Sequence, residues 1–267
     1  MIRYDILQPM ISHNSCVIGY GMVGKATSLL FDIKKHFDTE KSRSNITLKE
    51  AAKCDLVFIC LPTPEKLGRY IVEPIFETIK KIENYGNSAI YIIRSTVYPG
   101  FAMELQKKLK TNRVVSNPEF LSEDTWKKDI KYPPFVLLGS TSQDSVNLVK
   151  KIYKARMGKI PIFVTDNTTA ELAKLAMNSY FATKVIFANQ VFDYSKKVGA
   201  NYETVKEVLE SHPFGPKNHF TIWYKGKRGV NGNCLPKDSK AMAHYSDSKL
   251  LKTVISINKD LVKQERK

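Results

Sequence analysis

The sequence is short of cysteine, with four in 267 residues, at positions 16, 54, 60 and 234. No two of them form a C-x-x-C motif and their spacing does not suit zinc, so we expect neither a disulfide scaffold nor a metal site. Long apolar runs are also missing, and none approaches the ~20 residues of a membrane span. The opening segment MIRYDILQPMISHN has Asp5 and Pro9 where a signal peptide is unbroken and apolar. We therefore expect a globular protein of the cytoplasm.

Charge of one sign is in excess, because 42 lysines and arginines face 26 acidic residues and give a net charge of +16. Such a balance favours anionic partners, which include nucleic acids, dinucleotides and phosphorylated small molecules. The lysines are scattered in pairs near predicted helix ends, which is typical of a solvated surface and makes nucleic acid an unlikely partner. The segment KGKR, residues 225–228, differs because it lies just before Cys234.

Short β-rich segments alternate with helical stretches, as in a parallel sheet covered by helices on both faces. We expect strands over 15–19, 35–38, 55–60, 89–95, 113–116, 135–139 and 162–165. After Thr165 the strands stop, and residues 168–199 contain no proline or glycine before the final Gly199. The pattern predicts an α/β protein with a doubly wound parallel Rossmann-type sheet over 1–165. An all-helical domain with one long helix follows over 166–267.

The predicted long helix is apolar on all sides and longer than a compact domain needs to cover itself. We therefore expect a homodimer formed through the helix at 168–198.

The first predicted strand leads into GYGMVG, residues 19–24, and a helix follows. In that context Gly19, Gly21 and Gly24 favour a turn that binds the pyrophosphate of a dinucleotide, with Met22 and Val23 opening the helix. Asp38 closes the second strand at the distance expected for a ribose 2′-hydroxyl ligand, which favours NAD over NADP. Nearby Lys41 and Arg43 favour NADP instead. The alternative that Asp38 is only a turn residue also stays open.

Cys234 lies in RGVNGNCLPKDSK, a polar segment unlike the apolar surroundings of the other three cysteines, which read as buried small hydrophobes. Partial exposure near positive charge would allow a nucleophilic thiolate, although an inert loop cysteine is the alternative. Lys174 and Asn178, four residues apart, share one helix face with Glu171. Lys174 lies in the apolar stretch LAKLAM, so its ammonium must reach solvent, form an ion pair or serve a functional role. A surface pair of Glu171 with Lys174 is the alternative.

Four segments together resemble, in order, the signatures of the UDP-glucose/GDP-mannose 6-dehydrogenase family. They are STVYPG (95–100), NPEFLSED (117–124), TAELAKLAMNSYFATKVIFANQ (169–190) and GVNGNCLPKDSKAM (229–242). The resemblance extends from Gly19 to about Asn258. It implies an NAD-dependent, four-electron oxidation of the C6 alcohol of a nucleotide sugar, with UDP-glucose favoured, to a uronic acid through a cysteine thiohemiacetal and thioester.

The resemblance also implies residue roles. Cys234 would be the nucleophile, Lys174 and Asn178 would stabilise oxyanions, and Asp238 with Thr96 would hold a water. Thr63 and Thr96 would line the nicotinamide. The implied substrate-binding and carboxylate residues are Glu119, Phe120, Leu121, Glu123, Lys174, Asn178 and Gly232. The basic residues Lys225, Lys227 and Arg228 are expected to bind the phosphates of the substrate.

The sequence departs from the family pattern in several places. The family's second nucleotide-binding domain has no counterpart after INKDLVKQERK, and the section from Gly24 to Cys54 is shorter than usual. Asn231, Tyr98 and Ser122 stand where a glycine, a proline and an arginine are usual. Two alternatives therefore stay open. One is a two-electron hydroxy-acid dehydrogenase with Cys234 as a bystander, and the other is an accessory subunit whose partner chain supplies the missing domain.

Overall fold

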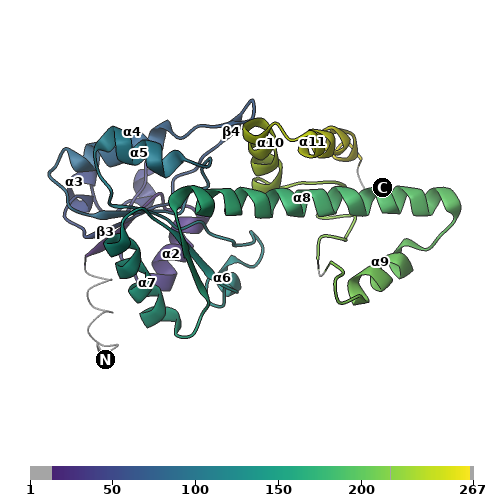
Figure 1. Ribbon diagram of the computed structural model, residues 1–267, viewed down its shortest axis with the longest axis horizontal. Helices are drawn as coiled ribbons and strands as arrows, with labels where there is room; N and C mark the ends of the chain where they lie inside the picture. Colours follow the sequence, from purple (N-terminus) through teal and green to yellow (C-terminus); the bar gives the residue numbers. More distant parts are fainter. Residues whose placement is uncertain (1–13, 217, 265–267) are drawn as a thin grey trace. The chain divides into compact units, whose positions relative to one another are not determined.

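The computed structural model describes residues 14–216 and 218–264 (Figure 1). Residues 1–13, which hold most of the segment used in the signal-peptide argument, lie outside the described residues. The chain divides into two compact units. The first holds the residues up to Thr63 together with Ile71–Lys174, and the second holds Pro64–Tyr70 together with the residues from Leu175 on.

A seven-stranded sheet forms the centre of the first unit, in the order β2-β1-β3-β6-β7-β8-β9. The strands are β1 (Ser15–Ile18), β2 (Lys35–Phe37), β3 (Leu56–Ile59), β6 (Ile90–Ile93), β7 (Val114–Ser116), β8 (Val136–Gly139) and β9 (Ile162–Thr165). All seven predicted strands are present and the fold class is confirmed. The sheet is parallel except between β7 and β8, which pair antiparallel at Ser116 and Gly139. The chain crosses from β2 back over β1 to β3, so the topological switch point lies between β1 and β3.

Helices cover both faces of the sheet, with α3, α4 and α5 on one side and α2, α6 and α7 on the other (Figure 1). Their bounds are α2 (Met22–Phe31), α3 (Leu48–Ala51), α4 (Glu73–Glu83), α5 (Phe101–Leu109), α6 (Trp126–Asp129) and α7 (Gln143–Met157), with a 3₁₀ turn at Lys41–Arg43. Alternate strand residues such as Val17 and Phe58 pack against Phe31 of α2 and Tyr153 of α7. Both β1 and β3 are buried along their whole length, as strands covered on both faces are.

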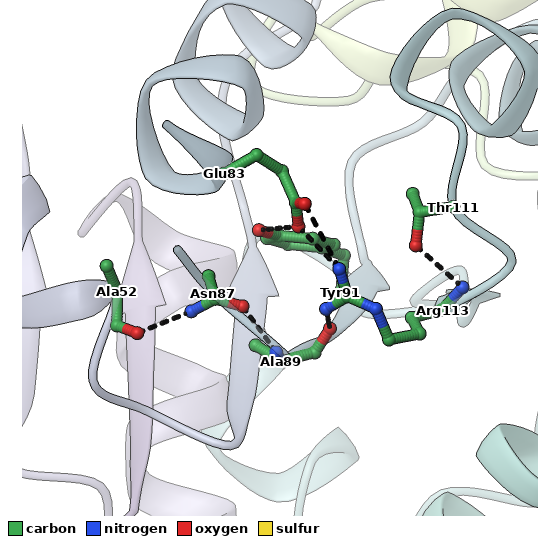
Figure 2. A network of polar contacts seen from close by, with 7 residues as sticks. All are labelled: Ala52, Glu83, Asn87, Ala89, Tyr91, Thr111 and Arg113. Atoms are coloured by element: carbon green, nitrogen blue, oxygen red, sulfur yellow. Dashed lines mark hydrogen bonds and ion pairs between the residues drawn. The ribbon is translucent and has the colours of Figure 1, made fainter. Parts of the chain in front are cut away.

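A polar network joins the end of α4 to the sheet (Figure 2). The guanidinium of Arg113, just before β7, lies 2.9 Å and 3.1 Å from the two carboxylate oxygens of Glu83. The hydroxyl of Tyr91, on β6, donates to the same carboxylate at 2.6 Å. One acid at the helix end thus connects α4 to two neighbouring strands.

The second unit is built on α8 (Asn167–Val198), which begins in the first unit and matches the predicted long helix. The other elements are α9 (Tyr202–Ser211), α10 (Cys234–Ser246), α11 (Lys249–Leu261) and a hairpin of β4 (Glu65–Lys66) with β5 (Arg69–Tyr70). Ile186 of α8 packs with Val254 and Leu261 of α11. The predicted boundary at 165/166 falls where α8 starts, whereas the division into compact units falls inside α8 after Lys174. Among the described residues, no helix has the length and apolar character that a membrane crossing needs.

Candidate active site

The turn after β1 brings the backbone of two loops into close contact. Gly19 has φ +90°, and a Cβ there would lie 2.7 Å from the carbonyl oxygen of Cys60, which follows β3. A Cβ on Gly24 would lie 2.0 Å from the carbonyl oxygen of Gly19. Both glycines are therefore required by packing. A Cβ on Gly21 would meet nothing within 4 Å, so at this position the helix start opens onto free space.

The N-terminus of α2 has the character of an anion site. Gly21 is the N-cap and supplies no side-chain acceptor, and the first turn, which opens with Met22 and Val23, contains no acidic residue. The first amides of a helix lack intrahelical partners and carry partial positive charge, which suits a phosphate. The glycine cradle and the uncapped helix start fit the pyrophosphate of a dinucleotide.

Asp38 follows β2 and faces this turn. Its carboxylate accepts the amide of Tyr20 at 2.7 Å and that of Glu40 at 3.0 Å. Burial opposes ionisation, but the amides of Glu40 and Tyr20 and the charge of Arg43 outweigh it and lower the pKa of Asp38. Arg43 is itself paired with Glu40 at 3.0 Å. An ionised carboxylate beside the glycine turn is the group that a ribose hydroxyl needs.

The loops after β3 and β6 lie side by side at the carboxyl edge of the sheet. The Thr63 hydroxyl donates to the carbonyl oxygen of Thr96 at 2.6 Å, and the Ser95 hydroxyl donates to that of Leu61 at 2.7 Å. Thr63 and Thr96, predicted from distant segments, are thus brought together.

Glu119 and Lys174 form a buried ion pair, with 3.7 Å between Nζ and Oε1 and side chains 7% and 6% exposed. The second carboxylate oxygen of Glu119 accepts the amide of Leu121 at 2.6 Å, and the Lys174 ammonium lies 5.1 Å from the centre of the Phe120 ring. Glu123, in the same segment, is exposed. Of the two predicted carboxylates, Glu119 is therefore buried and Glu123 is exposed.

Glu171 is buried too, so the alternative of a surface pair with Lys174 is wrong. Its carboxylate accepts the amides of Gly100 and Ala102, at 2.7 Å and 3.0 Å, and the hydroxyl of Ser116 at 3.0 Å. Burial raises the pKa of Glu171 to about 7, although these three donors lower it. A small cavity of about 10 Å³, room for one water, is lined by Ser95, Thr96, Ser116, Glu171 and Lys174, among others.

In the second unit, Cys234 is exposed and is the first residue of α10. The cysteine does not lie within a loop, because α10 starts at Cys234 itself. Asn233 is the N-cap and makes no side-chain cap bond, and the first turn holds no acid. The positive end of a helix favours the ionised form of a thiol, so the observed position supports the predicted chemistry by another route.

Asp238 lies one turn after Cys234 on α10 and is fully buried. Its Oδ2 accepts the side-chain amide of Asn178 on α8 at 2.6 Å. Its Oδ1 accepts the Tyr70 hydroxyl and the Lys237 ammonium, each at 2.6 Å. Asn178 and Asp238, sixty residues apart, are thus in direct contact.

Two family models match the sequence. The NAD binding domain of the UDP-glucose/GDP-mannose dehydrogenase family matches residues 32–157, and the central domain of the same family matches residues 168–260. The chain belongs to this family.

Family relatives match over most of this chain. UDP-glucose 6-dehydrogenase of Rickettsia conorii is 32% identical over 85% of this chain and 54% of its own length, and that of Bacillus subtilis is 30% identical over 79% and 50%. The chain thus spans about half the length of the curated relatives it matches. The solved UDP-glucose dehydrogenase of Pyrobaculum islandicum has a TM-score of 0.81 at 24% identity, covering 93% of this chain and 69% of that one. It shows the same fold.

The basic segment KGKR, residues 225–228, is divided in the structure. Lys225 and Lys227 are exposed in the turn that joins Tyr224 to Lys227. Arg228 is buried, and its guanidinium lies 2.8 Å from Asp193 and donates to Asn189 at 2.9 Å. Its charge is therefore committed inside the protein, and only the two lysines face solvent. Gly232, also exposed, has φ +80° and allows the chain to turn into α10.

Sequence reasoning missed Tyr70 altogether. The residue lies in a hairpin whose strands have two residues each, too short to show any alternation. The one signal was Leu67-Gly68, where both residues have positive φ, as a two-residue hairpin turn requires.

Proposed function

We propose that the protein oxidises the C6 alcohol of a nucleotide sugar, with UDP-glucose the favoured substrate, to the uronic acid through a covalent adduct on Cys234. The observation that carries the proposal is the cluster in the second unit. An exposed thiol begins α10, a buried carboxylate follows one turn later, and Asn178 binds that carboxylate directly.

Each unit has its own part in the proposed reaction. In the first unit, the glycine turn and Asp38 would hold NAD, which would supply the hydride acceptor for the two oxidations. The buried Lys174 is the group there that neutralises negative charge developing on the substrate oxygen. Glu119 holds the Lys174 ammonium in place.

In the second unit, the Cys234 thiolate attacks the aldehyde carbon left by the first oxidation and forms a thiohemiacetal. Loss of the second hydride leaves a thioester on Cys234. Asp238 then takes a proton from water, the water oxygen attacks the thioester carbonyl, and the carbon–sulfur bond breaks with its electron pair returning to sulfur. The products are a carboxylic acid and the free thiolate.

The phosphates of the substrate are assigned to Lys225 and Lys227, because these two are exposed whereas Arg228 is buried. A second copy of the chain is proposed as partner through α8, where Tyr180, Phe187, Tyr194 and Val198 form a stripe of apolar side chains, each more than half exposed. A cytoplasmic location completes the proposal, supported by Cys16, Cys54 and Cys60, which are buried as thiols and not as disulfides.

The test is NADH formation by the full chain over a panel of UDP- and GDP-sugars. We expect two NADH per sugar oxidised, and we expect Cys234→Ser to stop the reaction after the first oxidation. One NADH per substrate, unaffected by Cys234→Ser, would instead indicate a two-electron hydroxy-acid dehydrogenase. A folded chain that binds NAD but turns over no sugar on its own, and gains activity with a partner chain, would indicate an accessory subunit.

A further inference from the structure

The β4–β5 hairpin is held against the helix that carries Cys234. Isolated two-stranded hairpins are marginally stable, so one with two-residue strands needs an external support. Here the Arg69 guanidinium donates to His244 at 3.1 Å and Lys240 pairs with Glu65 at 3.5 Å. A Cβ on Gly68 would lie 2.6 Å from the Cβ of His244, so the turn packs directly on α10. The hairpin is thereby fixed relative to α10.

The last residue of the hairpin, Tyr70, is 5% exposed, and its hydroxyl donates to Oδ1 of Asp238 at 2.6 Å. The Lys237 ammonium binds the same oxygen and lies 4.3 Å from the centre of the Tyr70 ring. Burial, followed by the negative charge of Asp238, raises the pKa of Tyr70 far above its ordinary range. The hydroxyl therefore keeps its proton and acts as a donor to the carboxylate.

The two oxygens of Asp238 have different partners as a result. Oδ1 is held by Tyr70 and Lys237, and Oδ2 is bound to Asn178. Two donors on Oδ1 fix the plane of the carboxylate, and Oδ2 then fixes the amide of Asn178 with its nitrogen toward Asp238. Together the three hydrogen bonds hold the Asp238 carboxylate in one orientation.

We propose that Tyr70 is a positioning residue for hydrolysis of the Cys234 thioester, acting through Asp238. The inference rests on the proposed function for the identity of the thioester. Tyr70 touches neither the thioester nor the water in this scheme, and it orients the carboxylate that takes the water proton.

The test uses the full chain and p-nitrophenyl acetate, which needs neither NAD nor a sugar. The Cys234 thiolate attacks the ester carbonyl and releases p-nitrophenolate, leaving an acetyl thioester that water then hydrolyses. Tyr70→Phe should leave the acylation burst unchanged and slow deacylation about tenfold or more, because a charged hydrogen bond is lost. Cys234→Ser should abolish the burst. Intact mass should show acetyl-enzyme accumulating in Tyr70→Phe.

Tyr91→Phe is the matched control, because Tyr91 is also buried and also donates to a carboxylate at 2.6 Å, that of Glu83 (Figure 2). It should melt at a lowered temperature like Tyr70→Phe but deacylate at the wild-type rate. The other titratable groups around Asp238 and Tyr70, namely Lys237, Cys234 and Tyr245, are unchanged in both variants.

Equal deacylation by Tyr70→Phe and wild type would overturn the inference, and so would a burst that does not depend on Cys234. A Tyr70 effect on deacylation in a protein that oxidises no nucleotide sugar would sustain the role of Tyr70 and contradict the proposed function. The two proposals therefore fail separately.

Discussion

The carboxylate of Glu171, in the first turns of α8, accepts the backbone amide of Gly100 at 2.7 Å, at the point where α5 begins. The same carboxylate also accepts the amide of Ala102, so a side chain from one helix caps another. The side chain is only 3% exposed, and burial raises its pKa from 4.5 to about 7.

A raised pKa in the folded state means that the folded protein holds a proton that the unfolded chain has released. The contribution of Glu171 is therefore most favourable below pH 4.5, and it is lost as the pH rises to about 7. At ~1.4 kcal/mol per pH unit the full loss is about 3 kcal/mol. Glu171→Gln mimics the protonated acid, so it should match wild type at pH 4 and be more stable at pH 8 by up to that amount.

Urea unfolding at several pH values measures the difference. Asp166→Asn is a control, since Asp166 is an acid next to the start of α8 whose pKa is lowered by hydrogen bonds from Thr169. That variant should lose stability at neutral pH, the opposite sign. A Glu171→Gln protein that is less stable than wild type at pH 8 would contradict this prediction. The hydrogen bonds from the amides of Gly100 and Ala102 would then outweigh the cost of burying the charge.

Gly24 and Gly21, both in the glycine turn after β1, should respond differently to substitution by alanine. In Gly24→Ala the Cβ would lie 2.0 Å from the carbonyl oxygen of Gly19, so the backbone must shift and the first unit should lose stability by several kcal/mol. In Gly21→Ala the Cβ enters free space, so the melting temperature should stay near that of wild type.

NAD binding should nevertheless fall about tenfold or more in Gly21→Ala, because the methyl occupies the approach of the pyrophosphate to the start of α2. Calorimetric titration with NAD measures this, alongside a thermal melt of each variant. Full NAD affinity in a folded Gly21→Ala protein would place the pyrophosphate elsewhere.

The strands of the sheet were predictable because each is a short β-rich run bounded by turn residues. Five of them, β1, β3, β6, β7 and β8, are also buried along nearly their whole length. The candidate site was predictable in part, since the glycine turn and the motifs around Lys174 and Cys234 are local in sequence. Long-range contacts were not. The sequence alone does not show that Glu171 caps α5 or that Asp193 neutralises Arg228. Nor does it show that Tyr70 binds Asp238. Each contact depends on how distant segments pack.

The cysteine shows the same limit at short range. Asn233 and the glycine before it predict a turn, and they are equally suited to the residues that precede a helix. The choice between the two depends on the packing of α10 against α11 and the hairpin, which the local sequence does not contain.

The proposed dimer should depend on the apolar stripe of α8. Phe187→Glu places a charge in the middle of the stripe, where burial against a second copy would desolvate it, so a dimeric wild type should become monomeric. Sedimentation velocity at micromolar concentration measures the mass. Phe214→Glu is the control, because Phe214 is 95% exposed in the segment after α9 and lies outside the stripe. Equal masses for wild type and Phe187→Glu would rule out this face.

Arg228 should act on stability and not on phosphate binding. The guanidinium is buried, lies 2.8 Å from Asp193, and donates to Asn189 and Gln264. Removing it leaves these partners unsatisfied, so Arg228→Ala should lower the free energy of unfolding by about 3 kcal/mol. Lys227→Ala, one residue earlier and exposed, should leave that free energy within about 0.5 kcal/mol of wild type.

A double-mutant cycle with Asp193→Asn separates the ion pair from the packing of the arginine. Because Asp193 is 44% exposed, part of its charge is screened, and we expect a coupling of about 1 kcal/mol. The affinity for a nucleotide sugar should fall in Lys227→Ala, whereas a folded Arg228→Lys protein should keep it. An equal loss of sugar affinity in Arg228→Lys and Lys227→Ala would indicate that Arg228 also binds the substrate. The buried contacts alone would then not account for its role.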